Sequence, residues 1–300
     1  MELVKRLAAV RPTIEEVLIL TGTAGIKYGV IHRGYIVHTE SFGYRDTDQK
    51  LPVDEDTIFQ VASLTKNMLA AAVGMLVEEG KLRWDTPIKD VLPDWNIRDP
   101  TVHHLTTITD CLSHRTGLQM NNYWLESNNN IVIPATDSMK LINGLKPVYS
   151  FRGRHQYNNL GYEIIGHAIR QVSGQTWNDT LSVSPIQQFG YESNRNTSRF
   201  RRKDNVSKAY GALSNGTPVR IGDAHIGDNT VAGSGGGVRS TLNNMLKSTK
   251  AWLDAAPHQF ENRVTATSGL PLTQAIMSAQ ISIGSPSYHE TSYAMGFART

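Results

Sequence analysis

The alternation of apolar and polar residues predicts a β-hairpin near the start of the chain. Residues 25–31 and 35–43 are two runs rich in β-branched and aromatic side chains, and His32-Arg33-Gly34 lies between them. Such runs on either side of a short turn that contains glycine are typical of paired antiparallel strands. The hairpin is the first element that the sequence predicts.

Helical patterns dominate the middle of the chain. Residues 63–79, followed by Gly80, are apolar on nearly every face, which predicts a buried helix rather than a surface helix. Further helical patterns cover residues 107–114, residues 160–172 and a weaker stretch after Thr176.

The pattern changes again after Asp204. A polar, glycine-rich stretch leads to the turn 233–237, and a strand-like run at 293–297 comes close to the end of the chain. Two helical patterns lie between them, at 241–255 and at about 272–279.

A sheet element, then helices, then a return to sheet predicts an α/β fold of one domain over residues 1–300. We expect a discontinuous sheet lobe of about 1–60 and 205–300, with an all-helical lobe of about 61–204 inserted in it. A catalytic cleft would then lie between the two lobes.

The composition is that of an ordinary globular protein, with 39% hydrophobic and 19% charged residues. A formal net charge of +3 gives no argument for nucleic acid or an anionic membrane as a partner, so we expect neither. Arg11, Glu15 and Glu16 interrupt any apolar core of a signal peptide, and no stretch approaches the ~20 apolar residues of a membrane span. The expected location is therefore the cytoplasm.

Cys111 is the only cysteine, which excludes an intrachain disulfide. It lies in an apolar segment, so we interpret it as a small buried residue.

The predicted helix 63–79 carries one feature that points to chemistry. Lys66 is the only charged residue between Ser63 and Val77, and an unpaired buried ammonium requires either a partner or a lowered pKa. Ser63 lies about one turn earlier on the same face. A hydroxyl beside an amine at the positive end of a helix is an arrangement that activates serine as a nucleophile. The alternative is a serine cap followed by a lysine whose ammonium reaches solvent, and the Ser-x-x-Lys spacing alone does not decide between them.

The surrounding sequence resembles a known family. The segments that carry the resemblance are, in order, 57–66, 76–82, 84–87, 91–93, 107–118, 157–162 and 232–241. They resemble the β-lactamase-related serine hydrolases, which include class C β-lactamases, D-amino-acid-specific peptidases, family VIII esterases and lovastatin-type acyltransferases. The resemblance runs from about Gly25 to Phe297 and is closest to fungal members. It implies a β-lactamase/transpeptidase-like fold, an α+β sandwich with an antiparallel sheet.

The resemblance also implies roles for four residues. Ser63 would be the nucleophile, and Lys66 would accept its proton or keep the base ionised. Tyr157 would be a phenolate-like base, and Asn159 would hydrogen-bond Lys66 and the acyl side of the substrate. Because a free phenol has a pKa of ~10, Tyr157 would need a nearby cation to act near neutrality, so the two groups form a coupled pair.

One element of the family has no convincing counterpart. A Lys/His-Thr/Ser-Gly motif normally lies on a strand at the edge of the cleft and supplies a second oxyanion donor. Residues 247–249 lie in a helical pattern and end in threonine, and Ala266 precedes 267–269 where the family has Lys or His. In relatives the motif follows the run resembling 293–297 by some tens of residues. We therefore expect a portion of a longer protein or a shortened paralogue, and losing one oxyanion donor typically costs ~2.7–4 kcal/mol in the transition state.

These features predict an enzyme that forms an acyl ester on Ser63 and passes the acyl group to water or to an alcohol. The expected substrate is a small-molecule ester, thioester or amide. Secondary metabolism is one setting in which such an enzyme would act. The sequence predicts no particular oligomeric state. No cofactor or metal is expected: the glycine-rich turn is not followed by Gly-Lys-Ser/Thr, and His103 and His104 lack zinc-site spacing. The alternative is a catalytically impaired paralogue that acts as a binding or scaffold protein.

Overall fold

The computed structural model describes residues 2–120, 131, 133–183, 192–193, 205–262, 270, 273–284 and 291–299. Its α-helices are α1 (Glu2–Ala8), α2 (Arg11–Thr21), α3 (Thr65–Glu78), α4 (Ile88–Val91), α5 (Pro100–Leu105), α6 (Ile108–Leu112), α7 (Ser138–Asn143), α8 (Asn159–Ser173), α9 (Trp177–Val183), α11 (Gly233–Gly236), α12 (Leu242–Asn262) and α13 (Thr273–Met277). Its strands are β1 (Gly25–His32), β2 (Tyr35–Asp46), β3 (Leu51–Pro52), β4 (Ile58–Gln60), β5 (Glu192–Ser193), β6 (Tyr210–Ala212), β7 (Pro218–Arg220), β8 (Val238–Thr241), β9 (Ile281–Ser282), β10 (Ser292–Tyr293) and β11 (Ala298–Arg299).

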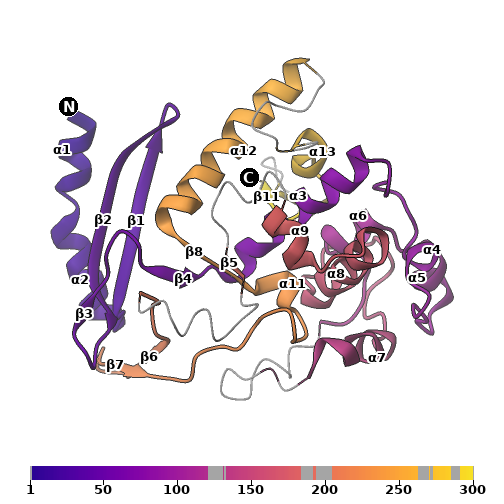
Figure 1. The fold of residues 1–300 in the computed structure, drawn as a ribbon, viewed down its shortest axis with the longest axis horizontal. Helices are drawn as coiled ribbons and strands as arrows, with labels where there is room; N and C mark the ends of the chain where they lie inside the picture. The colour runs from indigo at the N-terminus through magenta and orange to yellow at the C-terminus, as the bar shows by residue number, and fades with distance from the viewer. Residues whose placement is uncertain are drawn as a thin grey trace.

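The predicted hairpin is confirmed as β1 and β2, which pair antiparallel with Gly25 opposite Gly43. Arg33 and Gly34 both have positive φ angles, 50° and 80°, which suits the right-handed twist of a tight hairpin. Helices α1 and α2 lie along one side of this sheet (Figure 1), where Arg11 pairs with Glu40. The sequence patterns did not predict these two helices.

Helix α12 packs against β1 through leucines. A Cβ at Gly29 would lie 2.8 Å from Leu246 Cδ1 and 3.2 Å from Leu242 Cδ2, so glycine allows the close approach. The helix continues beyond the predicted 241–255 to Asn262, with Pro257 inside it. The sheet order is β1-β2-β3, so among the described residues β1 pairs with β2 on one edge and with no strand on the other.

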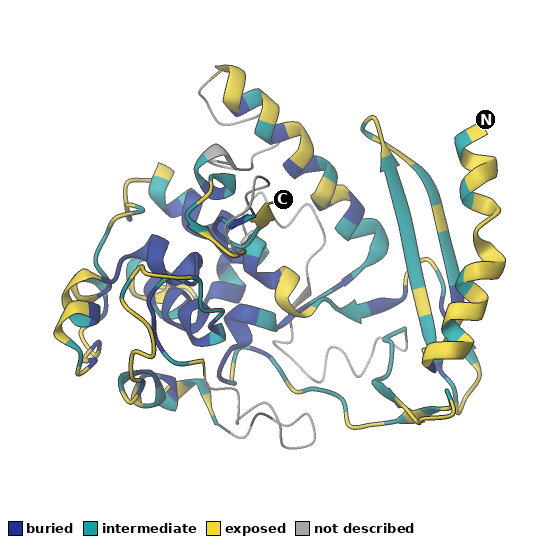
Figure 2. Cartoon of the chain, turned by 180° about the vertical axis from the view of Figure 1, so that it is seen from behind, coloured by how far each residue is buried: buried dark blue, intermediate teal, exposed yellow. Residues whose placement is uncertain are grey.

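Helix α3 is the centre of the buried core, as its all-round apolar pattern predicts. Ten of its residues are buried, and the helices around it form the dark region of Figure 2. Cys111 belongs to this core with no exposed surface, which confirms its interpretation as a buried residue. In the part of the chain that is described, no helix is both long enough and apolar enough to cross a membrane.

A short sheet brings two distant segments of the chain together. Strand β8 pairs with β4 on one side and with β5 on the other. The pairing continues where the Val61 amide donates to the Val238 carbonyl at 3.1 Å. It places the start of α3 beside the glycine-rich turn that precedes β8.

The strand predicted at 293–297 is wrong in its extent. Strand β10 ends at Tyr293, the chain turns at Gly296 with φ 85°, and β11 returns antiparallel to β10. This turn lies close against the start of α3, since a Cβ at Gly296 would lie 3.0 Å from the backbone of Asn67. Strands β9, β10 and β11 form a separate small sheet rather than extending the hairpin sheet. The division into two lobes at about 60 and 205 stays a prediction.

Candidate active site

Ser63 lies exposed in a single 3₁₀ turn, Ala62–Leu64, immediately before α3. Ala62 has a left-handed φ of 46°, which is unfavourable for a residue with a Cβ. Thr65 holds this conformation, since its hydroxyl donates to the Ala62 carbonyl at 2.7 Å and accepts from the Val238 amide at 3.2 Å. Strained residues of this kind cluster at functional sites.

Lys66 is buried directly beneath Ser63, with 1% of its surface exposed. Its ammonium donates to Ser63 Oγ at 3.2 Å, to Asn159 Oδ1 at 2.8 Å and to the Gly235 carbonyl at 2.7 Å. Burial lowers its pKa from 10.5 to about 7. The expectation of a partner or a lowered pKa is thus met on both counts, and the alternative of a lysine that reaches solvent is wrong.

The Tyr157 hydroxyl lies 2.8 Å from Ser63 Oγ. Asn158 starts α8 by accepting from the Leu160 amide, so the cap of this helix fixes Tyr157 just before it. Burial raises the pKa of Tyr157, and the hydrogen bond with Ser63 acts in the opposite direction. The fold therefore brings together two pairs of residues that lie 93–94 positions apart in the sequence, Ser63 and Lys66 with Tyr157 and Asn159.

His114 forms the wall behind Tyr157. Its ring centroid lies 4.4 Å from that of Tyr157 and 5.0 Å from that of Tyr293. Its Nδ1 accepts from the Asn158 amide at 3.1 Å, and burial lowers its pKa well below the usual value. His114 is thus a neutral packing residue rather than a charged one.

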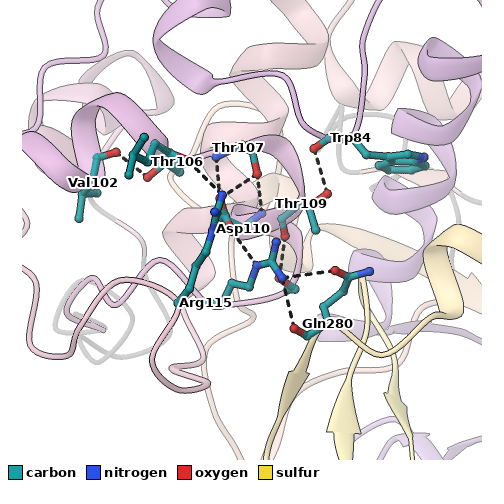
Figure 3. Close-up of polar contacts among 11 residues, drawn as sticks. Trp84, Val102, Thr106, Thr107, Thr109, Asp110, Arg115 and Gln280 are labelled. Atoms are coloured by element: carbon teal, nitrogen blue, oxygen red, sulfur yellow. Dashed lines mark hydrogen bonds and ion pairs between the residues drawn. The ribbon is translucent and has the colours of Figure 1, made fainter.

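A buried carboxylate joins this wall to the C-terminal sheet. Asp110 accepts from Arg115 Nε at 2.6 Å and from Arg152 Nε at 2.9 Å. Arg115 extends from it to the carbonyl of Gln280 at 3.2 Å (Figure 3). The Gln280 amide in turn donates to the Tyr293 carbonyl, so the network fixes Tyr293 against His114. A fully buried charge with several charge-assisted hydrogen bonds rigidifies the segments that it joins.

The glycine-rich turn supplies a group that the sequence analysis missed, the Gly235 carbonyl on Lys66. Glycine is needed here because a Cβ at Gly233 would collide with the Gly227 carbonyl. Glu163, four residues after Asn159 on α8, was missed as well, although it is a lone acidic residue among apolar ones in that helix. Its carboxylate accepts from the Ala232 amide at 3.0 Å and from Ser234 Oγ at 2.9 Å.

The two weak matches to the third family motif do not add to the site. Residues 247–249 lie inside α12, as their helical pattern predicts, and 267–269 lie outside the described residues. No three His, Cys, Asp or Glu side chains within the described ranges are grouped so that they could hold a metal ion.

Comparison with known proteins gives sequence relatives with related names. Penicillin-binding protein 4* of Bacillus subtilis is 28% identical over 155 residues, which cover 50% of this chain and 33% of that protein. The unguisins hydrolase of Aspergillus violaceofuscus is 30% identical over 143 residues, which cover 46% of this chain and 25% of that protein. The match therefore spans a third or less of the length of each relative.

The fold has a close counterpart among solved structures. EstCE1, described as a hydrolase with promiscuous acyltransferase activity, superposes with a TM-score of 0.78 at 18% identity over 99% of this chain and 84% of its own. This likeness shows the fold, which is of the β-lactamase and transpeptidase type with antiparallel sheets. The β-lactamase family model matches residues 10–282. The chain therefore belongs to the β-lactamase family of serine hydrolases.

Proposed function

We propose that the protein is a serine acyl enzyme that forms an ester on Ser63 and passes the acyl group to water or to an alcohol. The observation that carries the proposal is the pair of contacts at Ser63 Oγ, 2.8 Å to the Tyr157 hydroxyl and 3.2 Å to Lys66 Nζ. Both distances are within reach for proton transfer. The proposed substrate is a small-molecule ester, thioester or amide.

The pKa shifts favour neutral Lys66 as the group that finally holds the serine proton. Burial lowers the pKa of Lys66 to about 7 and raises that of Tyr157, so the first proton to leave this pair comes from Lys66. A neutral amine with a neutral phenol is then the reactive form near pH 7. Tyr157 then donates to Ser63 Oγ while Lys66 accepts the Ser63 proton, so Tyr157 acts as a neutral donor rather than as the phenolate-like base that the resemblance implies.

Acylation then follows with a balanced proton count. Ser63 Oγ attacks the acyl carbon as its proton passes to Lys66, and the leaving group takes that proton when the tetrahedral intermediate collapses. In the second half, Lys66 accepts a proton from water or an alcohol, whose oxygen attacks the ester. That proton passes to Ser63 Oγ when the acyl group leaves, which restores the neutral amine. The names of the relatives support hydrolysis and, through EstCE1, acyl transfer as an accompanying activity.

The test is labelling with a fluorophosphonate and with p-nitrophenyl butyrate, followed by mass spectrometry of the intact protein and its peptides. We expect one adduct, on Ser63, with a labelling rate that rises with pH through about 7 as Lys66 loses its proton. Ser63→Ala should abolish the adduct, and Ser214→Ala, which removes an exposed serine outside the site, should leave the labelling unchanged.

A folded, monodisperse protein without any adduct on Ser63 would contradict the proposal. That outcome would favour the alternative of a catalytically impaired member of the family that serves as a binding or scaffold protein.

A further inference from the structure

The buried carboxyl group of Glu163 takes no direct part in the proposed chemistry, yet it lies on the helix face that builds the site. Asn159 and Glu163 are four residues apart on α8, and residues at this spacing share a face. Gly166 continues the same face, where a Cβ would lie 2.9 Å from Ser234 Cβ. This face of α8 therefore packs directly on the glycine-rich turn.

Glu163 binds that turn at two points. Its Oε2 accepts from the Ala232 amide at 3.0 Å and from Ser234 Oγ at 2.9 Å. Ala232 has a left-handed φ of 63°, which is unfavourable for a residue with a Cβ. The bond from its amide is therefore a restraint on an otherwise disfavoured conformation.

The restrained turn carries the carbonyl that Lys66 uses. Ser234 is buried at 1% exposure, and the next residue, Gly235, accepts from Lys66 Nζ at 2.7 Å. A Cβ at Gly235 would lie 3.4 Å from that same Nζ, so the backbone itself is in contact with the ammonium. A small rotation of the turn would aim this carbonyl away from Lys66.

We propose that Glu163 is a positioning residue that holds the turn 232–236 so that the Gly235 carbonyl is directed at the Lys66 ammonium. The inference rests on the proposed role of Lys66 at Ser63. Glu163 acts through the backbone and touches neither Ser63 nor the ammonium in the contacts that hold the site.

The titratable groups that face Glu163 are His167 and Asp228. His167 Nε2 lies 3.8 Å from Glu163 Oε1, whereas the turn binds Oε2. Asp228 raises the pKa of Glu163 through its negative charge. Burial is the larger cause of that shift, and together they raise the pKa to about 7. Glutamine reproduces the neutral carboxyl group and keeps one carbonyl acceptor for the turn, whereas leucine has similar bulk and no acceptor.

The experiment measures the titration of Lys66 directly. The 300-residue chain with ¹³C-labelled lysine Cε would be titrated by NMR, and Lys66→Met would identify the Lys66 signal. The titration compares the parent with Glu163→Gln, Glu163→Leu and Ile164→Val. Ile164→Val is the control, because it shortens a neighbouring buried side chain of the same helix and removes no hydrogen-bond acceptor from the turn. We expect Glu163→Leu to lower the Lys66 midpoint by about one pH unit, since a lost hydrogen bond to a charged group disfavours that charged form. Glu163→Gln and Ile164→Val should stay near the parent midpoint.

Ser234→Ala removes the hydroxyl that donates to Glu163 and provides a second route if Glu163→Leu does not fold. Its midpoint should move in the same direction by a smaller amount. Unchanged midpoints in both variants, or an equal shift in Ile164→Val, would overturn the proposal.

Acylation of Ser63 by a fluorophosphonate is a separate readout. Its midpoint in pH should fall with that of Lys66 in Glu163→Leu. Its plateau rate at pH 9, where Lys66 is neutral in the parent and in the variants, should fall about tenfold in Glu163→Leu and recover in Glu163→Gln, as expected when a group outside the reacting atoms sets their geometry. If the Lys66 midpoint shifts in Glu163→Leu but the parent protein is never labelled on Ser63, the proposed function is rejected and the positioning role stands.

Discussion

Two regions of the molecule differ in how tightly they are packed. One is the group of helices around Lys66, and the other is the hairpin β1–β2 with helices α1 and α2. Helix α3 buries ten residues, whereas α1 and α2 bury none and the residues of β1 are at most half-buried. Figure 2 shows the contrast as dark helices on one side and a paler hairpin with its helices on the other.

The difference explains why the chemistry lies where it does. Burial lowers the pKa of Lys66 from 10.5 to about 7, because little water is left to stabilise the ammonium. In the same region, hydrogen bonds from Thr65 and to Glu163 restrain the left-handed residues Ala62 and Ala232. In the hairpin region, by contrast, Lys27 is half-buried, and burial lowers its pKa while the nearby carboxylates of Glu55 and Asp54 act in the opposite direction. The predictions below test this contrast, from the largest expected effect to the smallest.

The largest effect concerns the buried charge of Lys66. Between pH 7 and 10.5 the unfolded state binds more protons at this residue than the folded state, so the free energy of unfolding rises with pH across that window. Lys66→Met removes this dependence. The free energy of unfolding of Lys66→Met minus that of the parent should therefore fall by about 5 kcal/mol from pH 7 to 10.5, at 1.36 kcal/mol per pKa unit.

Urea unfolding at several pH values measures this difference, and Lys27→Met in the hairpin is the matched control. A stability difference between Lys66→Met and the parent that stays flat with pH would show that the ammonium is solvated in the folded protein.

The next effect compares two aliphatic truncations. Leu69 is fully buried in α3, and Leu69→Ala should lower the free energy of unfolding by about 4 kcal/mol. Ile36 in β2 is 47% exposed, and Ile36→Ala should change it by less than about 0.5 kcal/mol. Chemical denaturation of both variants provides the measurement. Equal losses would mean that the hairpin is packed as tightly as the core.

The smallest effect concerns Glu163. Burial raises its pKa from 4.5 to about 7, so the folded state binds more protons than the unfolded state between these values and stability falls as pH rises through them. Glu163→Gln cannot ionise, so it should gain about 3 kcal/mol over the parent between pH 4.5 and 7. Thermal or urea unfolding at both ends of the window measures the gain, and a parent whose stability tracks that of the variant would contradict it.

The sequence was sufficient for features that depend on local patterns. The alternation in 25–43 predicted the hairpin, and the apolar stretch after Ser63 predicted a buried α3 with a lysine in need of partners. Such patterns predict burial because a helix that is apolar all round is stable only inside a protein.

Local patterns were insufficient where the chain folds against distant neighbours. The run 293–297 looks like one strand, but it turns at Gly296, where the chain passes close to the backbone of Asn67. Glu163 stands out as the one acidic residue of α8, but the sequence does not show what it binds, because its partners Ala232 and Ser234 lie about 70 residues away. A backbone carbonyl such as that of Gly235 leaves no trace in the residue type.

The amino-acid sequence by itself determined which groups this protein can use: a serine, a lysine on an apolar helix, a tyrosine and an asparagine ahead of a second helix. The tertiary structure alone decided how these groups behave. It brought Gly235 and Asn159 to the ammonium, raised the pKa of Tyr157 and lowered that of Lys66. The physical reason is that desolvation and hydrogen-bond geometry depend on what surrounds a group in space, which spacing along the chain does not specify.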